Sequence, residues 1–282
     1  MADGWRSETY GGIEVEVPAE WGFGTSRWPS CVRQPPSGYV GRPGSIPLVG
    51  CMGRVPPLPD RVPYLWFDGV SAEPSIHSFD GGWVEESRDV AGVRVTVLTD
   101  DDALRSRLLL SARPVADDTD CPARHRILDG IEARPDPGPG GLAGMGRVES
   151  VTICRYFLGE RSGNPVLSLS RRTGETAERL VRAILSAPRG SGPNTPGNCV
   201  PEAMYGREAQ VLIVRDGVRV QQVFVRYSGC DGHGFDDGHT RRWLTTDTLE
   251  ILLAGPHRVL GGLQSAVARL RWPSRFDPAH PS

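Results

Sequence analysis

The sequence predicts an α+β fold of two domains, each a mainly antiparallel sheet packed by one or two helices and stapled by disulfides. The chain has 282 residues, whereas a single domain usually has roughly 100 to 200. Short strand-like runs are interleaved along it with amphipathic helical stripes, which indicates both kinds of element in each half. Six dispersed cysteines, an even number, favour a disulfide framework.

The strand-like runs of the first half lie at residues 13–17, 64–67, 82–85 and 93–98. In the first of them apolar residues alternate with acidic ones until Pro18, so its apolar side chains share one inward face. Residues 21–61 are rich in Pro, Gly and Trp and lack a helical period, which predicts a long irregular segment. Thr99 and the three aspartates after it cap a helix that ends before Pro114.

A run rich in Pro, Gly and Ala at residues 135–147 is interpreted as an interdomain linker. It separates a Trp-, Pro- and Gly-rich domain at 1–134 from a second domain at 148–272, which a tail at 273–282 follows. Because both halves exceed the length that a small core requires, each is expected to bury a core of its own.

The second half has strand-like runs at residues 151–157, 166–170, 209–214 and 218–227. The last two flank Asp216-Gly217, which is the strongest short-range hairpin signal. Thr173 precedes an apolar stripe at helical spacing and is expected to cap a helix that ends before Pro188. Further helices are predicted at 246–253 and 259–270.

The composition excludes several classes of function. A formal net charge of -2 and a pI of about 6.3 imply no basic face, so we expect no nucleic-acid partner. All 32 basic residues are arginine, and the absence of lysine excludes P-loop, Schiff-base, pyridoxal and Ser-Lys chemistry. Arginine without lysine, with 35 Gly and 25 Pro, is typical of a GC-rich genome such as that of an actinobacterium.

The cysteines indicate an oxidising compartment. They stand at Cys31, Cys51, Cys121, Cys154, Cys199 and Cys230. No C-x-x-C spacing occurs, which argues against zinc ribbons, thioredoxin-like motifs and iron–sulfur ligation. A widely spaced, even set is instead typical of a secreted or envelope protein.

Six cysteines allow 15 pairings, and the sequence does not select one. A Cys199–Cys230 bridge is the pairing that would tie the loop after Pro188 to the predicted hairpin. Three cysteines precede the linker and three follow it, so in that case Cys154 crosses to the first domain, with Cys121 nearest, or stays free. Full pairing therefore predicts a bridge between the domains or between chains.

The beginning of the chain does not match this compartment. Residues 1–12 contain no basic region, apolar region or cleavage site of a signal peptide. No run approaches the roughly 18 apolar residues of a membrane span. We expect an anchor or signal to precede Ala2 in the natural gene; a cytoplasmic protein with free thiols is the alternative.

The densest polar cluster is the loop from Cys230 to His239. Its Asp and His side chains are suitable ligands for zinc or a harder cation, and glycines would let the loop wrap around an ion. The ligands would be Asp231, His233, Asp236, Asp237 and His239. The spacing matches no known metal motif, however, and Asp-Gly pairs after a strand are also ordinary turn residues.

Other catalytic constellations are not evident. No G-x-S-x-G elbow accompanies the histidines, so a serine hydrolase is unsupported, and no cofactor motif is found. Tryptophans and tyrosines crowd the first third of the chain, where exposed rings would stack on sugars or a protein and buried rings would fill the core. The tryptophans are Trp5, Trp21, Trp28, Trp66 and Trp83.

Two stretches resemble known families. The pattern from Trp5 to Gly22 resembles the start of uncharacterised actinobacterial membrane-anchored or secreted cell-envelope proteins, and residues 151–156 with 227–232 resemble their second domain. The strand that ends in Val17-Pro18, followed by Trp21, is distantly similar to PsbP/Mog1-like lipoprotein domains. The first resemblance implies the cell envelope and carries no activity; the second is a hint of fold.

We therefore expect an extracytoplasmic, non-enzymatic binding or sensing module of the cell envelope. Its partner would be a protein or an envelope glycan, its ligand is not identified, and it would need no cofactor. A metal-binding protein or metal-dependent enzyme built on the loop from Cys230 to His239 is the alternative.

Overall fold

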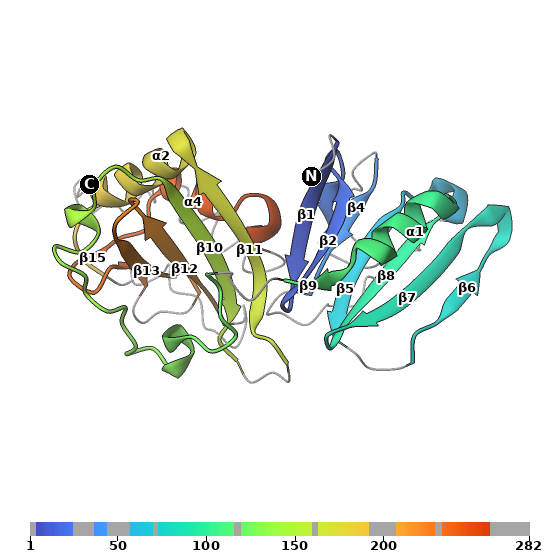
Figure 1. The fold of residues 1–282 in the computed structure, drawn as a ribbon, viewed down its shortest axis with the longest axis horizontal. Helices are drawn as coiled ribbons and strands as arrows, with labels where there is room; N and C mark the ends of the chain where they lie inside the picture. The colour runs from blue at the N-terminus through green and yellow to red at the C-terminus, as the bar shows by residue number, and fades with distance from the viewer. Residues whose placement is uncertain are drawn as a thin grey trace, which may run out of the picture. The chain divides into compact units, whose positions relative to one another are not determined.

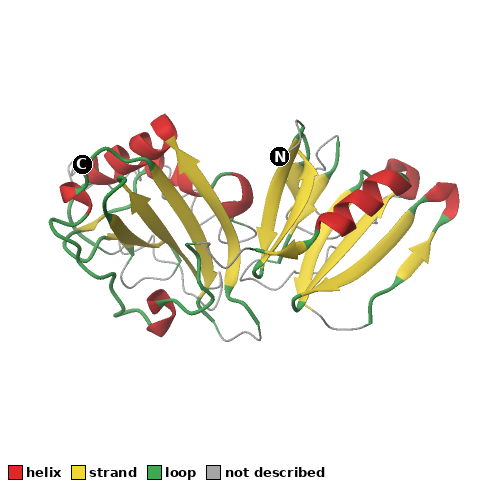
Figure 2. Ribbon diagram, in the orientation of Figure 1, coloured by secondary structure: helices red, strands yellow, loops and turns green. Residues whose placement is uncertain are grey.

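The computed structural model describes residues 4–24, 37–43, 57–69, 73–115, 120–159, 163–191, 207–228 and 233–259. The fold is α+β with mostly antiparallel sheets, as the sequence predicts (Figures 1 and 2). By its internal contacts the chain divides into two units, Met1–Thr119 and Asp120–Ser282.

In its described residues the first unit has a three-stranded sheet, β1-β2-β9, and a six-stranded sheet, β3-β4-β5-β8-β7-β6. The strands are β1 Trp5–Tyr10, β2 Ile13–Pro18, β3 Gly22–Gly24, β4 Tyr39–Gly41, β5 Tyr64–Gly69, β6 Ile76–Ser78, β7 Val84–Val90, β8 Val93–Thr99 and β9 Arg113–Pro114. Helix α1, Asp102–Ser111, packs against β8 and β2. The short 3-10 helices are η2 Leu58–Asp60 and η3 Asp80–Gly82.

Strand β2 and helix α1 confirm the pattern-based predictions. Ile13, Val15 and Val17 are each fully buried, because their alternation puts all three on one face of β2. Asp101 is the N-cap of α1, and its Oδ1 accepts a hydrogen bond from the Leu104 amide at 2.9 Å.

The segment 21–61 is less irregular than the sequence predicts. It contains β3 and β4, which pair in parallel with each other, and β4 also pairs in parallel with β5. Gly41 of β4 lies under the indole of Trp66, where an added Cβ would come within 2.4 Å of the ring. The run predicted at 82–85 begins as a strand only at Val84, because Gly82 belongs to η3.

In its described residues the second unit has one six-stranded sheet in the order β11-β10-β12-β13-β14-β15. The strands are β10 Ser150–Phe157, β11 Val166–Thr173, β12 Glu208–Arg215, β13 Val220–Arg226, β14 Gly234–Asp236 and β15 Arg241–Arg242. The helices are α2 Gly174–Ser186 and α4 Thr246–Leu252, with short 3-10 helices η4 Arg126–Asp129, η5 Leu142–Gly144 and η7 Gly255–His257.

The two faces of this sheet are covered differently. Helices α2 and α4 cover one face, here called the helix face (Figure 2). Val151, Ile153 and Arg155 of β10 project onto it, because they alternate with Cys154 and Tyr156. Residues 120–134, here called the strap, cover the opposite face, where Cys154 and Tyr156 pack with Ile127. Alternation along β10 thus assigns successive side chains to two separate cores.

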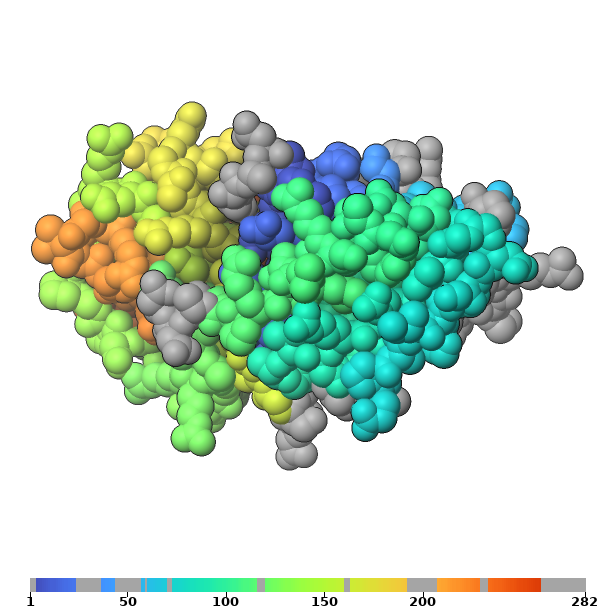
Figure 3. All heavy atoms as spheres, turned by 45° about the vertical axis from the view of Figure 1, so that its right-hand side comes forward, coloured from blue at the N-terminus to red at the C-terminus, as the bar shows by residue number. Residues whose placement is uncertain are grey.

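The predicted hairpin and helices of the second half are confirmed. Strands β12 and β13 pair antiparallel around the turn that begins at Asp216, and Gly217 has a φ of 82° there. The turn segment (orange) lies on the surface drawn in Figure 3, where Val218 is 92% exposed. Helix α2 buries Ala177, Leu180, Val181 and Ile184 of its predicted stripe.

One disulfide, Cys121–Cys154, is present in the described part of the chain, and it joins the strap to the sheet. Both cysteines belong to the second unit. The sequence led us to expect that a Cys121–Cys154 bridge would join two domains, but this bridge lies within one unit. Cys31, Cys51, Cys199 and Cys230 lie outside the described residues, as do the Cys199–Cys230 pairing and all but the start of the helix predicted at 259–270.

The segment 135–147, interpreted as a linker, packs on the second unit. Leu142 is 2% exposed, and its amide donates to Asp237. The boundary between the two units lies between Thr119 and Asp120, before the strap. The strap and the segment 135–147 therefore belong to the second unit, together with its sheet. No helix in the described ranges is both long and apolar enough to cross a membrane.

Candidate functional site

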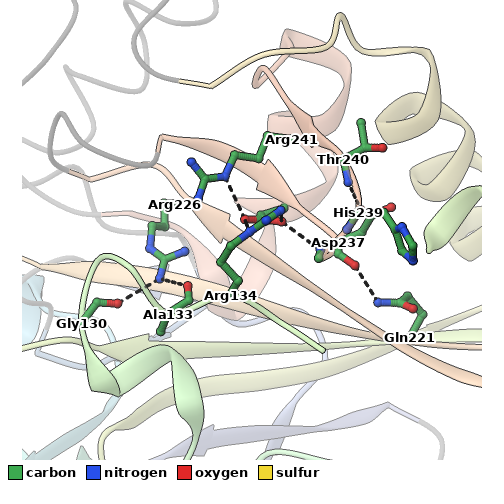
Figure 4. A network of polar contacts seen from close by, with 11 residues as sticks. Gly130, Ala133, Arg134, Gln221, Arg226, Asp237, His239, Thr240 and Arg241 are labelled. Atoms are coloured by element: carbon green, nitrogen blue, oxygen red, sulfur yellow. Dashed lines mark hydrogen bonds and ion pairs between the residues drawn. The ribbon is translucent and has the colours of Figure 1, made fainter. Parts of the chain in front are cut away.

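The described part of the loop from Cys230 to His239 contains β14 and leads into β15, and Figure 4 shows the polar network around it. Asp236 lies on the strap face. Arg134 of the strap binds its two carboxylate oxygens through Nε and Nη2, each at 2.8 Å, and Arg241 Nε donates to Oδ2 at 3.1 Å. Burial raises the pKa of the Asp236 carboxyl, but these arginines and the Gly238 amide outweigh it and lower the pKa.

Asp237 organises the loop itself. Its Oδ1 accepts hydrogen bonds from the amides of His239 at 2.9 Å and Thr240 at 2.6 Å, which is the pattern of an Asx turn. Its Oδ2 accepts from the Leu142 amide at 2.9 Å, and His239 Nε2 lies 2.9 Å from the Gly138 carbonyl oxygen. The loop and the segment 135–147 therefore hold each other in place.

His233 lies on the helix face, because β13 and β14 pair so that it stands beside Tyr227. It is 3% exposed, and its Nδ1 has no hydrogen-bond partner among the described residues. Burial lowers the pKa of this imidazole to about 4, with a hydrogen bond to the Tyr227 backbone opposing the shift. The ring is therefore neutral at physiological pH.

Of the five candidate metal ligands, the structure describes His233, Asp236, Asp237 and His239, and these four do not form one cluster. Successive side chains of a strand point to opposite faces of the sheet. His233 and Asp236 are three positions apart, so they lie on opposite faces. Asp231 lies outside the described residues. Over the described ranges, no three His, Cys, Asp or Glu side chains gather where they could hold a metal ion.

A buried polar cluster that the sequence does not single out occupies one end of the helix face. Arg155 Nη2 donates to Glu208 Oε2 at 2.6 Å, and both side chains are at most 2% exposed. The Tyr227 hydroxyl lies 3.3 Å from the same Glu208 oxygen, and Arg155 Nη1 reaches the Arg258 carbonyl at 3.2 Å. The cluster connects β10, β12 and the segment after η7.

His257 of η7 lies in the same region, between two serines of β11. Its Nδ1 is 2.9 Å from Ser168 Oγ and its Nε2 is 2.7 Å from Ser170 Oγ. Hydroxyls lie beside both ring nitrogens and His257 and Ser168 are fully buried, so neither nitrogen is left for the orienting carboxylate of a catalytic triad. We assign this trio to fixing η7 on the sheet; the alternating Ser168 and Ser170 were the only sequence signal for it.

The described tryptophans are mostly core residues. Trp21, Trp66 and Trp83 are 3%, 1% and 7% exposed, so they fill the interior of the first unit. Trp5 is partly buried beneath the guanidinium of Arg107, at 3.4 Å from the ring centroid. Trp28 lies outside the described residues. These four rings do not form an exposed stacking surface.

An open groove of about 750 Å³ lies between α2 and α4, on the outer side of these helices. Each helix contributes one face. The residues of α2 are Thr176, Arg179, Arg182, Ala183 and Ser186, those of α4 and its end are Asp247, Glu250, Ile251 and Ala254, and Arg172 of β11 completes the lining. The yellow segment that includes α2 is exposed on the face drawn in Figure 3.

Several of the residues that line the groove have small side chains. On α2, Ala183 and Ser186 are one turn apart, and Ala254 follows the end of α4. Their short side chains do not fill the space between the helix axes. The volume falls within the range of about 300 to 1,000 Å³ that small-molecule sites occupy.

Arg172 is the distinctive charge of this groove. It projects from β11 on the helix face, because it pairs with Val151, and it is only partly exposed. Burial lowers the pKa of its guanidinium, which means that its charge is incompletely solvated. Within the described residues it has no ion-pair partner, unlike Arg155 in the buried cluster.

The walls of the groove carry opposite charges. The α2 wall has Arg179 and Arg182 besides the nearby Arg172, whereas the α4 wall has Asp247 and Glu250. No ion pair joins these walls in the part of the chain that the structure describes. The sequence shows each charge but not the groove, because only the packing of α2 against α4 brings the two faces together.

No protein-family model, curated protein or solved structure matches the chain.

Proposed function

We propose that the protein is a non-enzymatic binding module that works outside the cytoplasm and binds an anionic group of its partner in the α2–α4 groove. The carrying observation is Arg172, a half-buried guanidinium that faces an open groove and has no counter-ion among the described residues. A guanidinium in this situation gains more from a carboxylate or phosphate than a fully solvated one does, because less of its own hydration is lost on binding.

The lining supports binding rather than catalysis. No histidine or cysteine is among the described residues of the groove, so it lacks the usual general base and the usual thiol nucleophile. Of its two hydroxyls, that of Ser186 donates a hydrogen bond to the Ala183 carbonyl oxygen at 2.9 Å. A protein or an acidic envelope glycan each carries the carboxylate or phosphate groups that this site would recognise.

The Cys121–Cys154 bridge supports the proposed compartment. A disulfide between a loop-like strap and a central strand persists only where thiols are not kept reduced. The cell-envelope assignment follows from this bridge together with the resemblance of the N-terminal pattern.

Titration of the full chain with N-acetyl-trialanine, which carries a single carboxylate, tests the proposal. Arg172→Gln should weaken binding at least about tenfold, because charge-assisted hydrogen bonds contribute about 1.5 to 3 kcal/mol. Binding by the unmodified protein should also weaken as salt is raised from about 0.05 to 0.5 M, since the groove is open to screening ions.

The matched control is Arg124→Gln, an exposed arginine of the strap on the opposite side of the sheet. Equal losses in the two variants would mean that the carboxylate binds through nonspecific charge, and an unaffected Arg172→Gln variant would place the site elsewhere. Either result contradicts the proposal. Thermal unfolding of both variants verifies that each remains folded.

A further inference from the structure

We infer that the groove takes a zwitterionic, peptide-like ligand, in which a carboxylate contacts the arginine wall and an ammonium contacts the acidic wall. This inference rests on the proposed function and names the ligand class of the same site. The observation behind it is the separation of charge between the walls, with arginines on α2 and β11 and carboxylates on α4.

Helical spacing places the acidic residues on one side of α4. Asp247, Glu250 and Ile251 lie at positions i, i+3 and i+4, which is one face of α4, and Ala254 lines the groove just after the helix ends. Asp247 and Glu250 are exposed and have no ion-pair partner in the described chain. Asp247 also complements the α4 dipole from its first turn, but Glu250, near the end of the helix, opposes that dipole.

The charge balance disfavours a purely anionic ligand. Three arginines and two carboxylates line the groove, so only one positive charge is in excess. A polyanion would gain from one wall and be repelled by the other. A ligand with charges of both signs gains from both walls, whereas a ligand of one sign gains from one wall and is repelled by the other, so it binds more weakly.

The small and apolar residues of the lining fit the part of the ligand between its charges. Ala183 and Ile251 are apolar and Ser186 is small, so a short aliphatic backbone would find contact without a large side chain in its way. The volume of about 750 Å³ accommodates a short oligopeptide. Free peptide ends supply one ammonium and one carboxylate, which is the complement that the two walls present.

Three probes of equal length test the inference on the full chain: trialanine with free ends, N-acetyl-trialanine and trialanine amide. The first carries both charges, the second only the carboxylate and the third only the ammonium. The unmodified protein should bind free trialanine about three- to tenfold more tightly than either blocked form, because each partly exposed ion pair contributes modestly.

Two variants separate the walls. The variant that combines D247N with E250Q should bind free trialanine and N-acetyl-trialanine equally, because the α4 wall no longer carries the negative charges that attract the ammonium. Arg172→Gln should lose affinity for both of these probes. Glu132→Gln, an exposed carboxylate on the strap, is the control and should retain the preference for free trialanine.

The outcomes distinguish this inference from the proposed function. In one outcome, the unmodified protein binds free and N-acetylated trialanine equally while Arg172→Gln loses affinity for both. That result would overturn the inference of a zwitterionic ligand, and the proposed anion site would remain supported. A preference that survives in the D247N and E250Q variant would also overturn it. Absence of binding of all three probes would overturn both.

Discussion

At the residue scale, His233 shows how burial decides the state of one side chain. Its sequence neighbours suggest a solvated ligand loop, yet the ring is 3% exposed on the helix face. A buried imidazole resists protonation, because the charged form loses its hydration without gaining a counter-ion. The folded protein therefore holds this histidine neutral well below the ordinary pKa of 6.5.

This shift predicts a loss of stability in acid. The pKa of His233 is about 4 in the folded protein and 6.5 in the unfolded chain, so only the unfolded chain binds the proton between these values. The contribution of His233 is fully present above pH 6.5 and is lost as the pH falls towards 4. From the difference, about 3 kcal/mol of unfolding free energy should disappear over this window.

Urea unfolding between pH 7 and pH 4 measures this loss, and His233→Gln should reduce it because glutamine takes up no proton. His77→Gln, at an exposed position of β6, should leave the pH profile unchanged. If the His233 variant keeps the full pH dependence of the unmodified protein, then burial of this ring is not the cause. The Asp236 carboxylate makes the unfolding free energy depend on pH only at lower pH, because its pKa in the folded protein is lowered.

At the element scale, the helix caps differ in a way that the sequence alone does not reveal. Asp101 and Thr173 both stand at helix N-caps and both belong to residue types that favour this position. The Asp101 carboxylate accepts a hydrogen bond from the first turn of α1, whereas the Thr173 side chain makes no cap hydrogen bond to α2.

We therefore predict unequal costs for removing the two side chains. Asp101→Ala should lower the unfolding free energy by about 1 kcal/mol, the usual cost of losing a cap hydrogen bond. Thr173→Ala should cost no more than a few tenths of a kcal/mol by the same reasoning. Thermal and urea unfolding of the two variants compare them, and a larger loss for Thr173→Ala would contradict this account.

Many elements could be predicted because their cause is local. Alternation in β2, the Asp216-Gly217 turn and the stripe of α2 each depend on residues within a few positions, and the structure confirms all three. Strand β4 was missed because its cause is distant. Tyr39–Gly41 forms a strand by pairing with β3 and β5, and Gly41 is needed there to accommodate Trp66.

At the scale of the whole molecule, the second unit depends on the attachment of its strap. The Cys121–Cys154 bridge joins residues 33 apart in sequence, and the strap covers the apolar residues of one sheet face. Polar contacts add to the bridge: the Tyr156 hydroxyl donates to the Pro122 carbonyl at 3.0 Å, and Arg226 Nη2 donates to the Ala133 carbonyl at 2.9 Å.

Replacing both cysteines by serine should lower the unfolding free energy of the second unit by about 3 to 4 kcal/mol, the chain-entropy value for a loop of this length. Changing both residues together leaves no unpaired thiol at either position. Amide hydrogen exchange is the measurement, with β10 expected to lose protection. Strand β8 of the first unit should keep its protection, because the bridge lies outside that unit; equal losses in both strands would contradict the assignment.

The candidate site itself belongs to this scale. Arg172, Arg179, Glu250 and Ala254 are visible in the sequence as residues of separate elements, and each has an ordinary role as a surface or cap-proximal side chain. No spacing rule connects residue 172 with residue 254. In the loop from Cys230 to His239, in contrast, Asp and His residues are close in sequence, but the described ones, residues 233–239, do not converge on a point that could hold a metal ion.

The sequence by itself determined the α+β class, most of the main strands and helices and the absence of lysine chemistry, and it predicted disulfides, of which Cys121–Cys154 lies in the described residues. These properties depend on local period, turn residues and composition. Only the tertiary structure decided that the strap belongs to the second sheet, that His233 and Asp236 face opposite sides and that two helix faces enclose a groove of divided charge. The physical reason is packing: which surfaces meet depends on how whole elements bury their apolar faces, and no local pattern encodes that partner.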